Sequence, residues 1–67
     1  MIRVNGESSR LEPGETVAGA LATLGIQGDA RGVAVAVDGE VVRRAEWESF
    51  ELPDGARVEV LTAMQGG

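Results

Sequence analysis

The fold of this 67-residue chain is decided by residues 32–42, which read Gly32-Val33-Ala34-Val35-Ala36-Val37-Asp38-Gly39-Glu40-Val41-Val42. The run from Val33 to Val37 is apolar on both faces, a pattern typical of a central strand that is covered on two sides. Asp38-Gly39 favours a two-residue hairpin turn, because a type I′ turn needs positive φ at both of its central residues. Glu40-Val41-Val42 then begins the returning strand. These residues predict a β-hairpin that contributes to the centre of a sheet.

A second hairpin is predicted at the N-terminus. Residues from Met1 to Asn5 alternate between apolar and polar, which is the period of a half-buried strand. Asn5-Gly6 is the strongest short hairpin signal. The segment from Glu7 to Leu11 then returns as a second strand, and its polar side chains suit the edge of a sheet. Pro13-Gly14 ends this strand.

One helix is predicted between the two hairpins. Thr16 is a good N-cap residue, and the helix is expected to run from Val17 to Leu24. Its apolar face has the spacing i, i+3, i+4 and i+7 and consists of Val17, Ala20, Leu21 and Leu24. Gly25 stands where a glycine would end the helix. The helix is therefore expected to lay one apolar face on the sheet.

The remaining segments complete the layout. Gln27–Arg31 is expected to be a polar loop, Arg43–Leu52 a less regular stretch, and Pro53-Asp54-Gly55 a turn before a last strand, Arg57–Met64. Strands grouped around a single helix predict an α+β fold with that helix packed on one face of a mixed sheet of about five strands. Short connections that do not cross would let the first hairpin and the last strand meet in the middle of the sheet. This is a β-grasp, ubiquitin-like layout.

Composition excludes several classes of function. The chain has no Cys and no His, so it offers no thiol nucleophile, no imidazole base and no usual zinc ligands. Its net charge of −5 disfavours a nucleic-acid partner, because phosphate binding needs a basic face. No apolar run is long enough for a membrane span and no leader-like segment is visible, so we expect a cytoplasmic protein without a membrane partner. The glutamates show no spacing that indicates acid–base catalysis, and we predict no catalytic residue, no metal and no cofactor bound by this chain.

The chain ends on Gln65-Gly66-Gly67, directly after the last predicted strand. Two glycines carry no side-chain bulk and adopt almost any φ and ψ. Two extended residues reach roughly 7 Å, enough to present the carboxylate of Gly67 inside the active site of another protein. We therefore predict one domain over residues 1–64 and a flexible, reactive C-terminal tail over residues 65–67.

A docking surface is predicted next to this tail. Along the last strand, Val58 and Val60 fall on one side, while Leu61 and Ala63 fall on the other. If the two valines face the helix, Leu61 and Ala63 lie on the open side of the sheet. We expect a partner to dock there, with Met64 and Arg44 contributing; the alternative is that these are scattered surface hydrophobic side chains. Trp47, in contrast, is expected to pack at the edge of the core.

Several of these features together resemble the ThiS family of ubiquitin-like sulfur carriers of thiamine biosynthesis. The resemblance spans essentially the whole chain. Its landmarks are Met1 to Asn5-Gly6, Gly14-Glu15-Thr16-Val17, Val33-Ala34-Val35-Ala36-Val37, Val41-Val42-Arg43-Arg44-Ala45-Glu46-Trp47, Asp54-Gly55 and Gly66-Gly67. The combination of Val-Val-x-Arg-x-x-Trp with a terminal diglycine is the specific part.

The resemblance implies a protein cosubstrate that is not itself an enzyme. An adenylyltransferase of the ubiquitin-activating type would use ATP to adenylate the Gly67 carboxylate. A sulfur donor, a cysteine desulfurase or persulfide enzyme, would then convert the adenylate to a thiocarboxylate, which would supply sulfur to thiazole synthase. Three alternatives are left open: the small subunit of molybdopterin synthase, a ubiquitin-like modifier that forms an isopeptide bond, and a non-covalent β-grasp interaction module.

Overall fold

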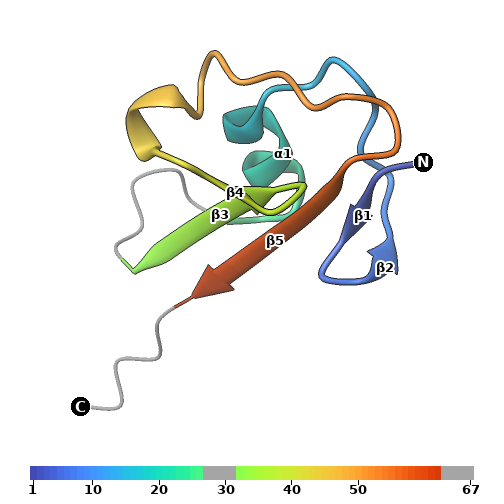
Figure 1. Cartoon of the computed structure of the whole chain (residues 1–67), viewed down its shortest axis with the longest axis horizontal. Helices are drawn as coiled ribbons and strands as arrows, with labels where there is room; N and C mark the ends of the chain where they lie inside the picture. Colours follow the sequence, from blue (N-terminus) through green and yellow to red (C-terminus); the bar gives the residue numbers. More distant parts are fainter. Residues whose placement is uncertain (27–31, 63–67) are drawn as a thin grey trace.

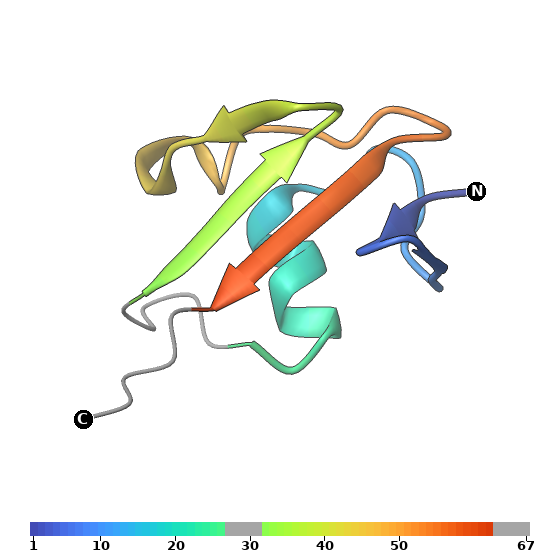
Figure 2. The ribbon, with the colours of Figure 1, turned by 60° about the horizontal axis from the view of Figure 1, so that its bottom comes forward.

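The computed structural model describes residues 1–26 and 32–62. In chain order, the elements are β1 (Arg3–Val4), β2 (Glu7–Ser8), α1 (Val17–Thr23), β3 (Val33–Val37), β4 (Glu40–Val42), the 3₁₀ helix η1 (Arg44–Glu46) and β5 (Arg57–Thr62), as shown in Figure 1. The five strands form one mixed sheet in the order β2-β1-β5-β3-β4. Figure 2 shows α1 crossing behind the strands. The predicted α+β, ubiquitin-like β-grasp fold is confirmed.

Both predicted hairpin turns are present. Asn5 and Gly6 have φ of 53° and 85°, and Asp38 and Gly39 have φ of 52° and 88°. These positive values at both central positions are what a type I′ turn requires. The first turn pairs β1 with β2, and the second pairs β3 with β4, each in antiparallel register. As predicted, β2 lies at an edge of the sheet.

The last strand occupies the middle of the sheet. β5 runs parallel to β1 on one side and antiparallel to β3 on the other. The predicted meeting of the first hairpin with the last strand is therefore confirmed. β5 extends over Arg57–Thr62; Met64, to which we expected it to continue, lies outside the described residues, as does the predicted loop Gln27–Arg31.

The helix begins and ends where the sequence indicates. The N–H of Gly19 donates a hydrogen bond to Thr16 Oγ1 at 3.0 Å, which satisfies one of the free donors of the first turn. Leu24 is the C-cap, and Gly25 follows with φ of 81°. The buried core between α1 and the sheet comprises Ile2, Leu11, Val17, Ala20, Leu21, Val35, Val37, Val42, Trp47, Leu52, Ala56, Val58 and Val60. Trp47 is thus in the core, as predicted.

The prediction that β3 is covered on both faces is wrong. Val35 and Val37 are buried beneath α1, but Ala34 is exposed and Ala36 is half-buried. The Val/Ala alternation is the period-two pattern of a half-buried strand, with the larger side chains on the inner face. Small alanine side chains expose little apolar area, so this side of the strand does not need a second covering layer. The sheet keeps one face open.

Asn5 joins the first hairpin to the central strand. Its N–H donates to the carbonyl oxygen of Val58 at 2.8 Å. Its side-chain Nδ2 donates to the carbonyl oxygen of Val60 at 3.3 Å, and the N–H of Val60 donates to Asn5 Oδ1 at 3.0 Å. The side-chain amide therefore takes the place of the next peptide group in the β1–β5 ladder, beyond the point where β1 ends.

Replacing Asn5 tests this link. Asn5→Ala should lower the free energy of unfolding by about 2–3 kcal/mol, because it removes two hydrogen bonds and puts alanine in the left-handed region. Asn5→Gly removes the same hydrogen bonds without the backbone strain and should cost less. Urea denaturation followed by circular dichroism measures both. A glycine variant as stable as the wild type would show that the side-chain bonds contribute nothing.

Candidate functional site

The candidate site is built around β5, because this strand leads to the diglycine. Hydrogen bonding to β1 and β3 holds β5 on both sides, and Thr62 is paired with Val33 at its end. Val58 and Val60 are buried, whereas Glu59 and Leu61 are exposed. The predicted orientation of the strand is confirmed. The sheet fixes the position of β5, the strand that precedes the C-terminal residues in the sequence.

The face of the sheet opposite α1, which we call the open face, carries a group of apolar side chains. Register places Leu61 of β5 beside Ala34 of β3, and Ala36 of β3 beside Val41 of β4. Leu61 is 66% exposed and Val41 is 75% exposed. The two alanines lie between them on β3. We call these four residues the apolar patch, and its two large side chains flank a low strip formed by the alanines.

The predicted docking residues do not all lie on the same part of the structure. Leu61 lies on the open face, as expected. Arg44 is not on a strand of the sheet: it belongs to η1, and its guanidinium carbon is 5.1 Å from the centroid of the Trp47 ring. Its role in docking stays a prediction. The other predicted site residues, which are Ala63, Met64, Gln65, Gly66 and Gly67, lie outside the described residues.

Ala34, Ala36 and Val41 were missed by the sequence reasoning. A signal for them was available, because a two-residue turn at Asp38-Gly39 fixes the register of the two strands that it joins. That register pairs Ala36 with Val41. What the local pattern could not supply was the pairing of β3 with β5, which brings Leu61 to the same patch.

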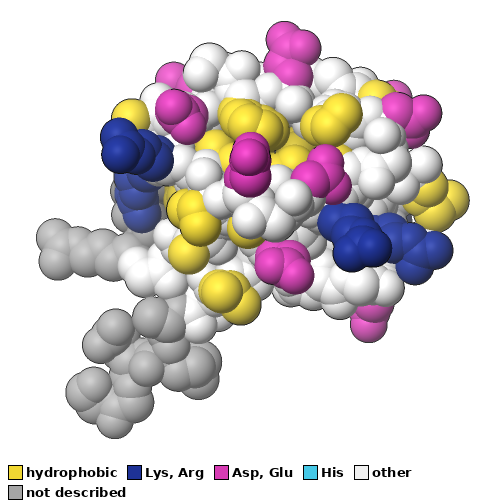
Figure 3. All heavy atoms as spheres, viewed as in Figure 1, with side chains coloured by type: hydrophobic (Ala, Val, Ile, Leu, Met, Phe, Trp, Pro, Cys, Tyr) yellow, Lys and Arg dark blue, Asp and Glu magenta, His cyan; other side chains and the backbone are white. Residues whose placement is uncertain are grey.

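The other end of the open face is charged. Arg3 of β1 and Arg57 of β5 are register partners, and both are exposed. Since Ile2 and Val58 are buried on the helix side, the two arginines point to the open face. We call them the arginine pair. In the view of Figure 3, basic side chains gather at two places, whereas acidic side chains are spread over the surface.

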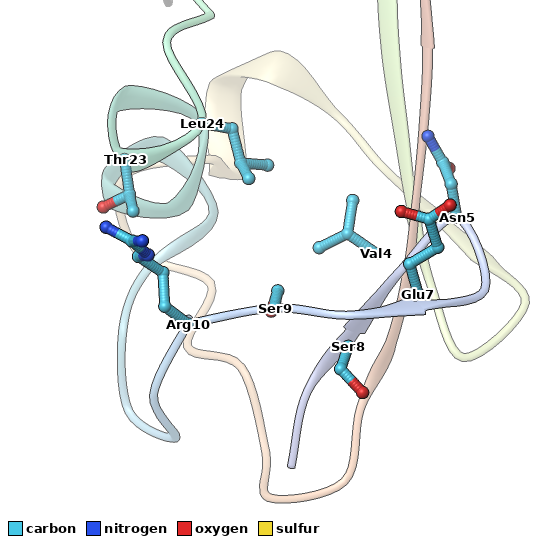
Figure 4. Close-up of a pocket in the computed structure, with 8 residues that line it drawn as sticks. All are labelled: Val4, Asn5, Glu7, Ser8, Ser9, Arg10, Thr23 and Leu24. Atoms are coloured by element: carbon cyan, nitrogen blue, oxygen red, sulfur yellow. The ribbon is translucent and has the colours of Figure 1, made fainter.

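A separate groove lies between the first hairpin and the end of α1. It has a volume of about 700 Å³ and is lined by Val4, Asn5, Glu7, Ser8, Ser9, Arg10, Thr23 and Leu24. Figure 4 shows Val4 and Leu24 pointing toward one another across it, with Glu7 and Arg10 at opposite ends.

This groove does not have the groups of a catalytic centre. The hydroxyl of Ser9 donates to the carbonyl oxygen of Ile2 at 2.8 Å, and the hydroxyl of Thr23 donates to Glu15 at 3.1 Å. The hydroxyls of Ser9 and Thr23 are thus used in structural hydrogen bonds, and the chain has no His or Cys to activate these two or the hydroxyl of Ser8. Over residues 1–26 and 32–62, no group of three or more Asp or Glu residues is placed to hold a metal ion. No helix in this part of the chain is long and apolar enough to cross a membrane.

Comparison with known proteins identifies the family. The model of the ThiS family matches residues 2–67. The crystal structure of a thiamine biosynthesis protein (ThiS) from Geobacter metallireducens is similar, with a TM-score of 0.76 and 34% sequence identity over 98% of this chain and 97% of that chain. The NMR solution structure of a thiamine biosynthesis protein from Geobacter metallireducens gives a TM-score of 0.73 and 33% identity over 98% of this chain and 86% of that chain. A search of curated proteins finds no match. Because the family model covers nearly every residue, the chain belongs to the ThiS family.

Proposed function

We propose that this protein is a sulfur carrier of thiamine biosynthesis, a cosubstrate on which partner enzymes act. The observation that carries the proposal is a ThiS-family match that extends through Gly66-Gly67. The two similar structures bear the name of thiamine biosynthesis proteins. The fold supports the role, because β5 leads from a hydrogen-bonded position in the sheet to the diglycine. The same match favours this function over that of a molybdopterin synthase small subunit.

The proposed chemistry takes place at the carboxylate of Gly67. An adenylating partner joins this carboxylate to the α-phosphate of ATP and releases pyrophosphate, which turns a poor electrophile into a mixed anhydride. A persulfide sulfur then attacks the carbonyl carbon and displaces AMP. Cleavage of the resulting S–S bond by a thiol leaves a disulfide on the donor and a thiocarboxylate on Gly67. The thiocarboxylate is a stronger nucleophile than a carboxylate and donates its sulfur to thiazole formation.

Intact mass spectrometry tests this function. The purified protein is incubated with the adenylating enzyme of its own genome, ATP and a persulfide donor. We expect a product that is heavier by the difference between a sulfur and an oxygen atom, and no such product without ATP. Recovery of the unmodified acid alone, or of a conjugate with another protein, would contradict the sulfur-carrier function.

The apolar patch is proposed to dock the adenylating partner. Leu61→Glu or Val41→Glu should weaken binding about tenfold or more, because a carboxylate buried in an apolar interface loses its hydration without gaining a partner. We expect the same of Ala63→Glu. Ala22→Glu, on the exposed side of α1, is the matched control and should bind normally. Isothermal titration calorimetry measures the affinities. Wild-type affinity for both Leu61→Glu and Val41→Glu would show that the partner docks elsewhere.

A further inference from the structure

The arginine pair places two like charges side by side in the sheet. Arg3 and Arg57 are direct register partners on the parallel strands β1 and β5, so their like charges repel one another. Among residues 1–26 and 32–62, Asp54 pairs with the N-terminal amine of Met1, and no acidic group forms an ion pair with Arg3 or Arg57. Neither guanidinium of the arginine pair is therefore neutralised by an ion pair within this part of the chain.

The acidic groups nearest in register reduce this positive charge, but neither forms an ion pair with Arg3 or Arg57. Asp38 accepts the backbone N–H of Arg57 at 2.9 Å, so its bond is to the main chain. Glu59 lies on the same face of β5 between Arg57 and Leu61, and it is the register partner of Ala36 in the apolar patch. Two hollows of about 350 Å³ each lie beside Arg57, one lined by Asp38, Gly39 and Glu59, the other by Arg3, Gly6 and Glu59. Arg57 shares one hollow with Asp38 and both hollows with Glu59, and these hollows leave the guanidinium donors open to a partner although carboxylates lie nearby.

The arginine pair and the apolar patch share one face. Arg57 and Leu61 are four residues apart on β5, which corresponds to roughly 13 Å along a strand. A standard interface covers about 800 Å² on each partner, so one partner surface can contact both. The face is apolar toward the end of β5 and basic toward its start. Such asymmetry fixes the orientation of a partner as well as its position.

We propose that the arginine pair binds a carboxylate of the protein that docks on the open face. The proposal rests on the proposed function, because it takes the adenylating enzyme as that partner. Guanidinium groups form short, bidentate hydrogen bonds with carboxylates, and two adjacent arginines offer donors to one carboxylate or to two neighbouring ones. The partner surface is thus expected to carry acidic side chains roughly 13 Å from an apolar contact.

A nucleotide phosphate fits this position less well than a carboxylate. ATP must react at the tail, which follows the end of β5, whereas Arg57 begins that strand. The five-residue step from Arg57 to Thr62 corresponds to roughly 17 Å in a strand, and Gly67 follows five residues later in the sequence. This separation favours a carboxylate of the partner over the nucleotide as the ligand of the pair.

Charge variants of the full chain, measured against the adenylating enzyme of the same genome, test the proposal. Arg3→Glu with Arg57→Glu should weaken binding on the order of tenfold or more at low salt, and the loss should shrink as salt is raised. The milder variants Arg3→Gln and Arg57→Gln provide a second reading if the reversals destabilise the sheet. Arg10→Glu, in the groove beside α1, changes the net charge of the chain by the same amount as either single reversal and should bind nearly as wild type. Circular dichroism confirms that each variant is folded.

The outcomes separate this site from the proposed function. If Arg57→Glu and Arg10→Glu weakened binding of the adenylating enzyme equally, the effect would come from net charge alone and the proposed carboxylate site would be wrong. Wild-type affinity in both glutamine variants would also overturn it, while sulfur loading of the wild type would leave the proposed function intact. If the affinity depended on Arg3 and Arg57 only when ATP is present, the arginine pair would bind the nucleotide, and the proposal of a partner carboxylate would be wrong. Arginine-dependent binding without sulfur loading would support the site and contradict the sulfur-carrier function.

Discussion

Deletion of Gly67 is expected to abolish sulfur loading completely. The carboxylate would then belong to Gly66 and would end about 3.5 Å short of its original reach, so it could not meet the nucleotide at the active site of the partner. Gly66→Val should also fail, because a branched side chain widens the tail and restricts a backbone that only glycine leaves free. ATP-dependent loading by the adenylating enzyme, followed by intact mass spectrometry, measures both.

Thermal stability is the control for these tail variants. Terminal residues contribute little to folding, so both variants should melt within a degree or two of the wild type. They should also bind the partner through the open face. Full loading of the protein without Gly67 would refute the assignment of Gly67 as the reacting residue. A non-covalent interaction module makes the opposite forecast, in which function survives the loss of the tail.

The features of the fold that follow from short sequence patterns were predictable. Asn5-Gly6 and Asp38-Gly39 specify their turns because few other residue pairs adopt positive φ twice in succession. Thr16 specifies the start of the helix, because its hydroxyl supplies the bond that the first turn lacks. The residues that cause each turn and the start of the helix lie within a few positions of it, so a short sequence pattern is enough to predict these features.

The features that depend on pairing between distant strands were harder to predict. The arginine pair exists because β1 and β5, separated by most of the chain, align Arg3 with Arg57. No local pattern gives that register. The prediction that both faces of β3 are covered was wrong for a related reason. The sequence shows that Ala34 and Ala36 are apolar, but whether another layer covers them depends on the rest of the fold. The prediction of a reactive tail needs no such information, because it rests on the residue types Gly66 and Gly67 alone.

Trp47→Ala is expected to have the largest effect on stability. The ring is 3% exposed, and its Nε1 donates to the carbonyl oxygen of Val42 at 2.9 Å. The carbonyl oxygen of Trp47 also accepts the N–H of Ala18 at 2.8 Å, which connects η1 to the helix. Truncation of a buried tryptophan costs about 3–5 kcal/mol, whereas a domain of this size has a total stability of roughly 3–10 kcal/mol. The variant should therefore lose about a third of its stability or more, which far-UV circular dichroism in urea would show as a lower unfolding midpoint.

Two milder variants locate the source of this stabilisation. Trp47→Phe keeps most of the ring but leaves the carbonyl oxygen of Val42 without its donor, and it should cost about 1–3 kcal/mol. Arg44→Ala removes the guanidinium above the ring and should cost about 0.5–1 kcal/mol. This order follows from burial, because the indole and its hydrogen bond are inside the core while Arg44 is exposed. If Arg44→Ala lowered the free energy of unfolding as much as Trp47→Phe does, this order would be wrong. The stabilisation would then come from the surface of η1, and Arg44 would have a structural role as well as its predicted role in docking.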